Sequence, residues 1–141
     1  MMTLTLDWKG GLQFANSPGS PAIELHSHTR GVPSPPEALA YAVMACMAMD
    51  VVHVLDKGRH ELVSMRVSFT GERAKEHPRR FVSMSIRFDL TGRVDPRAVE
   101  RAIALSRSTY CSVWNSLASD MELTTSFEVR PPATDARPGT H

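Results

Sequence analysis

The feature that most constrains the fold of this chain is an uninterrupted apolar run from Ala38 to Met49. The preceding Ser34-Pro35-Pro36-Glu37 is typical of a helix start, because serine caps free amide groups, proline suits the first helical position, and the glutamate completes a capping box. Gly58 is a stop signal. We therefore predict a helix from Pro35 to Lys57. It is apolar around its whole circumference, so it needs packing partners on every side.

Length and charge exclude several classes of protein. The apolar run is shorter than the roughly twenty residues that a membrane span requires, so we expect it in a core and expect no membrane partner. The formal charge of +1 gives no general reason to bind nucleic acid. The N-terminal residues have no basic leader followed by an apolar segment, and the two cysteines form no Cys-x-x-Cys pair. We expect a reducing, cytoplasmic compartment.

Alternating apolar and polar residues predict strands on both sides of this helix. Leu4, Leu6 and Trp8 begin a hairpin that turns at Gly10-Gly11, and a third short strand is predicted around Ile23 to Leu25. After the helix, residues 63–69 and 82–90 are predicted to form an antiparallel pair with one solvated face. The mixed-charge segment between them is interpreted as a solvated loop.

The rest of the chain completes an α+β pattern. Asp95-Pro96 starts a second helix that is predicted to end near Tyr110, a shorter helix is predicted over Cys111 to Leu117, and a closing strand over residues 123–129. We predict one domain over residues 4–130 and a disordered, proline-rich tail over residues 131–141. Five or six strands and two modest helices cannot surround the apolar helix, so we predict an intimate homodimer.

The two cysteines differ in their local sequence. Cys46 lies inside the apolar run, where a lone thiol is usually inert and resists ionisation unless a positive charge is near. Asp50 and His53 follow on the same helix face, so a polar cluster beside the thiol is expected, whereas nothing in the spacing favours a metal site. Cys111 opens the predicted short helix, where free amides lower a thiol pKa, and from the residues alone it is the more reactive cysteine. The alternative for Cys111 is a structural helix corner.

Both cysteines lie in motifs that resemble the OsmC/Ohr hydroperoxide reductases. The first motif matches a serine, proline and glutamate leading a buried helix with a central cysteine, and the second is most similar to the YhfA-like branch. The matching segments are Ser34–Leu39, Ala45-Cys46, Asp50–Val52, Leu105-Ser106 and Tyr110–Val113, with Trp8–Gly11 and Phe81. The resemblance runs from about Leu4 to Val129 and implies an OsmC-like fold. That fold has antiparallel sheets, a long buried central helix and an entwined homodimer with its sites at the interface.

The resemblance also implies a thiol peroxidase activity on organic hydroperoxides, an antioxidant role in oxidative stress. Cys46 would attack the peroxide and become a sulfenic acid, and Cys111 would condense with it to a disulfide. An external dithiol, a lipoylated protein in related enzymes, would reduce that disulfide, and no cofactor is implied. Glu37 matches a family glutamate that orients a charged partner near the thiol. Its role in the capping box explains it equally well.

One departure from the family pattern concerns the positive charge. Hydroperoxide reductases of this family carry an arginine in the N-terminal hairpin, and here Lys9–Phe14 contains none. Arg30 is the nearest substitute, and without a cation within about 4 to 6 Å a buried Cys46 would stay largely protonated at neutral pH. The alternative function is therefore a noncatalytic OsmC-like protein that binds a small apolar or electrophilic ligand at the dimer interface. Met44, Met47, Met49 and Trp114 would line that site, although they also suit a core.

Overall fold

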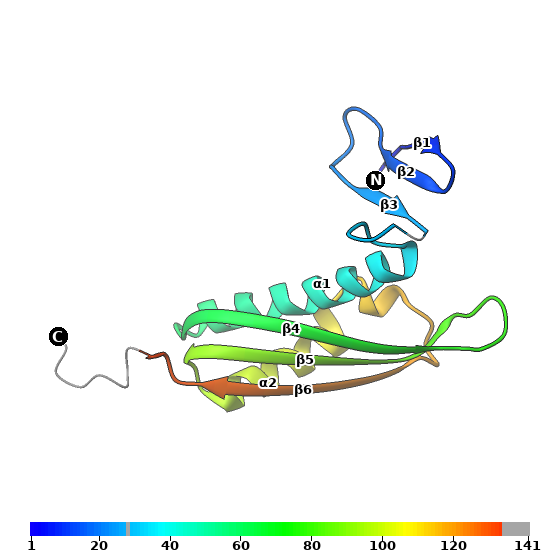
Figure 1. The fold of residues 1–141 in the computed structure, drawn as a ribbon. Coiled ribbons are helices and arrows are strands. Elements are labelled where there is room, and N and C mark those ends of the chain that lie inside the picture. Colours follow the sequence, from blue (N-terminus) through cyan, green and yellow to red (C-terminus); the bar gives the residue numbers. More distant parts are fainter. Residues whose placement is uncertain (28, 134–141) are drawn as a thin grey trace. The chain divides into compact units, whose positions relative to one another are not determined.

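The chain forms two compact units in the computed structural model, which describes residues 1–27 and 29–133. The units are Met1–Ala42 and Val43–His141, and one helix, α1, begins in the first and continues through the second (Figure 1). The single domain over residues 4–130 stays a prediction. The predicted disorder of the tail falls, from residue 134 onward, outside the described residues.

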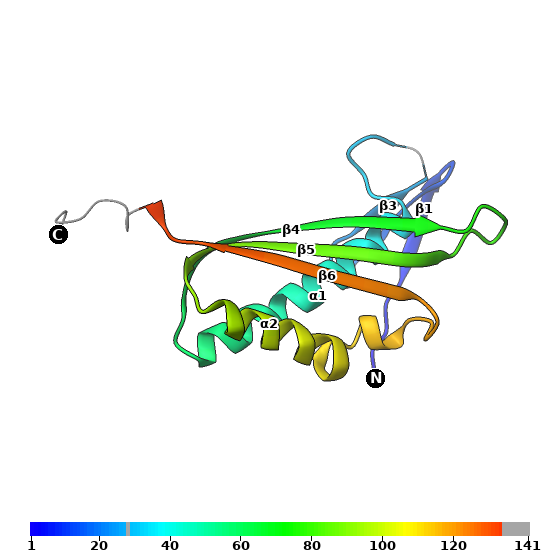
Figure 2. The ribbon, with the colours of Figure 1, turned by 90° about the horizontal axis from the view of Figure 1, so that it is seen from below.

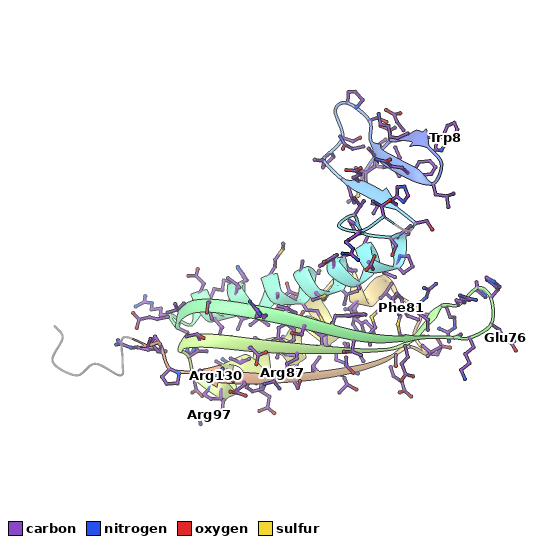
Figure 3. The ribbon with its side chains drawn as sticks, viewed as in Figure 1. Trp8, Glu76, Phe81, Arg87, Arg97 and Arg130 are labelled. Carbon is purple, nitrogen blue, oxygen red and sulfur yellow. The ribbon has the colours of Figure 1, made fainter. Side chains whose placement is uncertain are left out.

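The first unit contains a small antiparallel sheet of three strands in the order β1-β2-β3. β1 covers Leu6–Gly10, β2 covers Gln13–Asn16 and β3 covers Glu24–His26. These strands confirm the predicted hairpin and the short third strand. The apolar side chains of the predicted buried face are exposed in this unit: Trp8 (Figure 3) is 66% exposed, and Leu6, Phe14 and Ile23 are also exposed.

Helix α1 has the bounds predicted from the sequence, Pro35–Lys57. Its capping box is formed in both directions, because the Ser34 N–H donates to Glu37 Oε1 at 2.9 Å and the Glu37 N–H donates to Ser34 Oγ at 3.3 Å. By length and composition alone the helix could cross a membrane. In the second unit its residues Val43, Met47, Val51 and Leu55 are fully buried in the hydrophobic core, as in the core helix of a globular domain.

The second unit is a three-stranded sheet with helices on one face (Figure 2). β4 (Glu61–Arg73) and β5 (Phe81–Arg93) pair antiparallel, as predicted. β6 (Glu122–Arg130) pairs parallel to β5, so the expectation of purely antiparallel sheets is wrong for this pair. The chain returns from the end of β5 through helix α2 (Pro96–Leu105) before it enters β6, and such a crossover connects parallel neighbours.

The segment after α2 differs from the prediction. The second helix ends in a π-helical turn, η1 (Ser106–Tyr110), and the predicted helix over residues 111–117 is reduced to a 3₁₀ turn, η2 (Trp114–Ser116). Polar side chains share carbonyl oxygens with the backbone here: Asn115 Nδ2 donates to those of Arg107 at 3.1 Å and Cys111 at 2.8 Å, and the Asn115 N–H also donates to that of Cys111 at 3.0 Å. Short polar side chains compete in this way with continuous helix.

Gly92 lies opposite a β-bulge in β4, where the backbones of β4 and β5 approach each other closely. Its φ is 153°, and a Cβ atom there would lie 2.2 Å from the carbonyl oxygen of Glu61 and 2.9 Å from the Cα of Leu62. Both of these are backbone atoms, so they cannot move aside as a side chain could.

We expect Gly92→Ala to lower the free energy of unfolding by roughly 2 to 3 kcal/mol, measured by urea denaturation. Ser85→Ala, at an exposed position of the same strand, is the control and should change it by less than about 0.5 kcal/mol. Equal midpoints for the two variants would contradict this account.

Candidate functional site: a thiol pair in the second unit

The two cysteines lie in contact within the second unit. Cys46 projects from α1 and is partly buried, whereas Cys111 follows the π-helical turn η1 and is 0% exposed. Both are free thiols, and each sulfur alters the pKa of the other. The structure thus brings together the two cysteines that the sequence motifs singled out, although no step of chemistry follows from proximity alone.

Cys46 receives three hydrogen bonds from the segment that carries the other cysteine. Burial raises the pKa of Cys46, and the nearby Asp50 carboxylate also raises it. The backbone N–H of Val113, the Cys111 thiol and the Ser112 hydroxyl donate to the Cys46 sulfur and outweigh both effects, so that the pKa of Cys46 lies below its ordinary value. These donors were not predicted from the sequence, because they lie far from Cys46 along the chain and only a nearby cation was expected.

Cys111 has the opposite electrostatic environment. Burial, the neighbouring Cys46 and the Asp50 carboxylate together raise its pKa to about 11, although the Trp114 N–H donates to its sulfur at 3.3 Å. Cys46, not Cys111, is therefore the more acidic thiol, and the prediction that Cys111 is the more reactive one is wrong in this respect. No regular helix begins at Cys111, and its side chain is fully enclosed, so desolvation exceeds the effect of one amide.

Of the predicted polar cluster, Asp50 lies beside the thiols and His53 does not. Asp50 lies one helical turn after Cys46 and accepts a hydrogen bond from Ser106 Oγ at 2.7 Å. His53 is exposed, and within residues 1–27 and 29–133 it forms no hydrogen bond or ion pair. The same described residues contain no group of three or more His, Cys, Asp or Glu side chains arranged to hold a metal ion.

Arg30 and Glu37 belong to the first unit. They line one open cavity of about 390 Å³ together with Val32, Pro33 and Tyr41. The hydrogen bonds from the Ser34 backbone and then from its side chain hold the pKa of Glu37 below its ordinary value, which confirms the capping role. A contribution of either residue to the thiol chemistry stays a prediction, since the thiols lie in the other unit.

The residues proposed to line a ligand site have different environments. Met47 is fully buried in the core, which agrees with the structural interpretation of this side chain. Met44 and Trp114 are partly buried against that core. Met49 is 68% exposed on α1.

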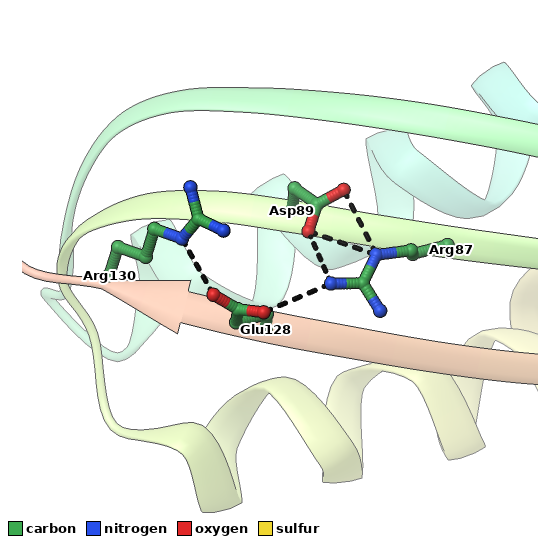
Figure 4. A network of polar contacts seen from close by, with 4 residues as sticks. All are labelled: Arg87, Asp89, Glu128 and Arg130. Carbon is green, nitrogen blue, oxygen red and sulfur yellow. Dashed lines mark hydrogen bonds and ion pairs between the residues drawn. The ribbon is translucent and has the colours of Figure 1, made fainter.

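A network of ion pairs lies on the solvated face of the β4-β5-β6 sheet (Figure 4). It was not predicted from the sequence. Arg87 contacts Asp89 at 2.9 Å and Glu128 at 3.0 Å, and Arg130 contacts the other oxygen of Glu128 at 2.6 Å. The alternation of charges along residues 87–89 and 128–130 was the available signal. All four side chains are more than a third exposed, so the network adds little to stability.

The fold is that of a known family. The family model described as OsmC-like protein matches residues 28–126, and the chain belongs to this family, as the cysteine motifs predicted. It is similar to the protein YhfA of Escherichia coli K12, with 38% identity over 131 residues that cover 91% of this chain and 98% of that protein.

Solved structures agree with the assignment of the fold. A hypothetical protein from Aquifex aeolicus has a TM-score of 0.83 and 26% identity, over 93% of this chain and 98% of that one. The organic hydroperoxide resistance protein OsmC from Legionella pneumophila has a TM-score of 0.69 and 16% identity, over 92% and 98% of the two chains. At that identity the Legionella structure supports the fold alone.

Proposed function

We propose that this protein is a thiol-dependent peroxidase that reduces organic hydroperoxides. One observation carries the proposal: the Cys46 sulfur accepts hydrogen bonds from Val113, Cys111 and Ser112 that lower its pKa, while Cys111 stays protonated. Thiolates, not thiols, are the nucleophiles in peroxide reduction. The more acidic thiol, Cys46, is therefore the nucleophile, and the less acidic thiol, Cys111, is the resolving thiol.

The proposed reaction has three steps. The Cys46 thiolate attacks the terminal oxygen of the hydroperoxide, the O–O bond breaks, and the alkoxide takes up a proton and leaves as an alcohol. Cys46 is then a sulfenic acid. The Cys111 sulfur attacks the Cys46 sulfur and expels water, which leaves a Cys46 to Cys111 disulfide. An external dithiol supplies two electrons and two protons, restores both thiols and is itself oxidised to a disulfide.

Several partners follow from this proposal. The reductant is an external dithiol of the lipoylated-protein type, and the compartment is the reducing cytoplasm, in which both cysteines remain free between turnovers.

In this proposal Arg30 supplies the positive charge that favours the Cys46 thiolate, since the N-terminal hairpin has no arginine, and Glu37 orients Arg30. The substrate class is proposed by analogy with the Legionella pneumophila OsmC, an organic hydroperoxide resistance protein with the same fold.

The proposal is tested by peroxide consumption with cumene hydroperoxide as the probe and dithiothreitol as the dithiol. We expect catalytic consumption of the hydroperoxide, with one dithiothreitol oxidised per hydroperoxide reduced. A rate equal to that of dithiothreitol alone would overturn the peroxidase assignment. It would favour the noncatalytic protein that binds a small apolar or electrophilic ligand.

A second copy of the chain is part of the proposed functional unit. Apolar side chains recur on one face of α1 at the helical spacing of Tyr41, Ala45, Met49 and Val52. Tyr41 is 63% exposed, Met49 68% and Val52 44%. An exposed apolar stripe of this kind marks an interaction surface, so we propose a homodimer in which it is covered.

Met49→Glu is expected to weaken this dimer by at least about a hundredfold, because a buried, unpaired carboxylate costs several kcal/mol. Sedimentation equilibrium measures the change. Ser68→Glu is the matched control, since Ser68 lies on the solvated face of β4, and it should leave the association constant unchanged. A wild-type protein that is monomeric at every concentration would contradict the dimer.

A further inference from the structure

A partly buried hydrogen bond links the two segments that carry the thiols. Ser106 Oγ in η1 donates to Asp50 Oδ2 in α1 at 2.7 Å. Ser106 is 0% exposed and lies 56 residues after Asp50 in the sequence. Hydrogen bonds to charged acceptors are among the stronger ones in proteins, and a partly buried one restricts how its two segments move relative to each other.

Ser106 is also the residue that positions Cys111. Its carbonyl oxygen accepts the Cys111 N–H at 2.8 Å, which closes the π-helical turn. Asp50 itself lies one turn after Cys46 on α1. A short chain of contacts therefore runs from the helix of Cys46 through Asp50 and Ser106 to the backbone of Cys111.

We propose that Asp50 is a positioning residue, whose contact with Ser106 holds the Cys111 turn against the Cys46 helix so that the two sulfurs are in reach for disulfide formation. The inference rests on the proposed function for its role in turnover. The contact itself acts on the thiol pair whether or not a hydroperoxide is the substrate.

The charge of Asp50 has a second consequence at the same site. The titratable groups that face it are Cys46 and Cys111, and its carboxylate raises the pKa of both. In the part of the chain that the structure describes, Asp50 forms no ion pair with a basic side chain. Asp50 thus aligns the sulfurs and at the same time opposes their ionisation.

Two substitutions separate these effects. Ser106→Ala removes the donor and keeps the negative charge, whereas Asp50→Asn removes the charge and keeps a carbonyl acceptor for the Ser106 hydroxyl. Ser108→Ala, at an exposed serine of η1, and Asp56→Asn, at an exposed aspartate of α1, are the matched controls. Circular dichroism verifies that each variant is folded, and Asp50→Ala removes the same contact from the other side if Ser106→Ala does not fold.

The first measurement is disulfide formation with diamide, a diazene oxidant that takes one hydrogen from each thiol and becomes a hydrazine. We expect Ser106→Ala to form the Cys46 to Cys111 disulfide about tenfold more slowly than wild type, the effect of losing a hydrogen bond of roughly 1.4 kcal/mol. Asp50→Asn keeps an acceptor for Ser106 and favours the thiolate, so it should form the disulfide no more slowly than wild type, and Ser108→Ala should stay near the wild-type rate. Equal rates for Ser106→Ala and Ser108→Ala would overturn the positioning role.

The second measurement is the pH dependence of Cys46 alkylation by iodoacetamide, with Cys111→Ser present in every variant. Removal of a negative charge favours the thiolate, so Asp50→Asn should move the profile to lower pH, whereas Asp56→Asn should leave it in place. Coincident profiles for these two variants would overturn the electrostatic role. Neither measurement uses a hydroperoxide, so a wild-type protein without peroxidase activity would refute the proposed function and leave this inference intact.

Discussion

Cys46→Ser is expected to reduce the consumption of organic hydroperoxide to the uncatalysed background, a loss of at least about a thousandfold, as is usual when a nucleophile is removed. The Cys46 sulfur is the acceptor of the hydrogen bonds from Val113, Cys111 and Ser112, which stabilise negative charge on it. A serine hydroxyl stays protonated in the same environment and cannot attack the O–O bond. The measurement is the initial rate with cumene hydroperoxide and dithiothreitol.

Met44→Leu is the control for this substitution, because Met44 lies on the same helix, partly buried against the same core. A change of similar volume should leave the rate within about threefold, since such swaps cost little stability. If Cys46→Ser and wild type consumed hydroperoxide at the same rate, Cys46 would not be the nucleophile. Loss of activity in both variants would indicate that packing, not the thiol, had been disturbed.

Cys111→Ser is expected to block disulfide formation while leaving the first attack on the hydroperoxide intact. One equivalent of hydroperoxide should convert wild type to a species about 2 Da lighter, through loss of two hydrogens in the disulfide, and convert the variant to one about 16 Da heavier, a sulfenic acid. With excess hydroperoxide the variant should then oxidise further and lose activity. Mass spectrometry of the intact protein distinguishes these products.

The pH dependence of this second step follows from the acidity of Cys111. Burial is the largest cause of its raised pKa and persists after Cys46 is oxidised, so the thiolate fraction of Cys111 is small at neutral pH and increases with pH. Disulfide formation after oxidation should therefore quicken by up to about tenfold per pH unit as the pH rises toward that pKa. Two free thiols in wild type after one equivalent of hydroperoxide, or a rate independent of pH, would contradict the resolving role.

Much of the fold was predictable because its signals are local. Ser34 and Glu37 form their capping box within one turn, and Gly58 follows the last helical residue, so both ends of α1 were evident from neighbouring residues. The strands follow from alternation at a period of two residues. The cysteine motifs also predicted the OsmC-like family, which the family model confirmed.

The candidate site could be predicted only in part. The sequence singled out Cys46 and Cys111, and it placed Asp50 beside the first of them, because residues four apart share a helix face. It could not indicate that Ser112 and Val113 donate to the Cys46 sulfur or that Ser106 contacts Asp50, since these pairs are far apart in the chain. It also predicted a helix at Cys111 where the side chains of Asn115 and Ser116 bond to nearby carbonyl oxygens instead.

The sequence by itself therefore determined both ends of α1, the strand positions and the identity of the two thiols. The tertiary structure alone decided that β6 runs parallel to β5, that the thiols meet, and that Cys46 rather than Cys111 is the more acidic. The physical reason is the range of the interactions. Caps and periodicity act over a few residues, whereas a thiol pKa depends on burial and on donors that the whole fold brings to the sulfur.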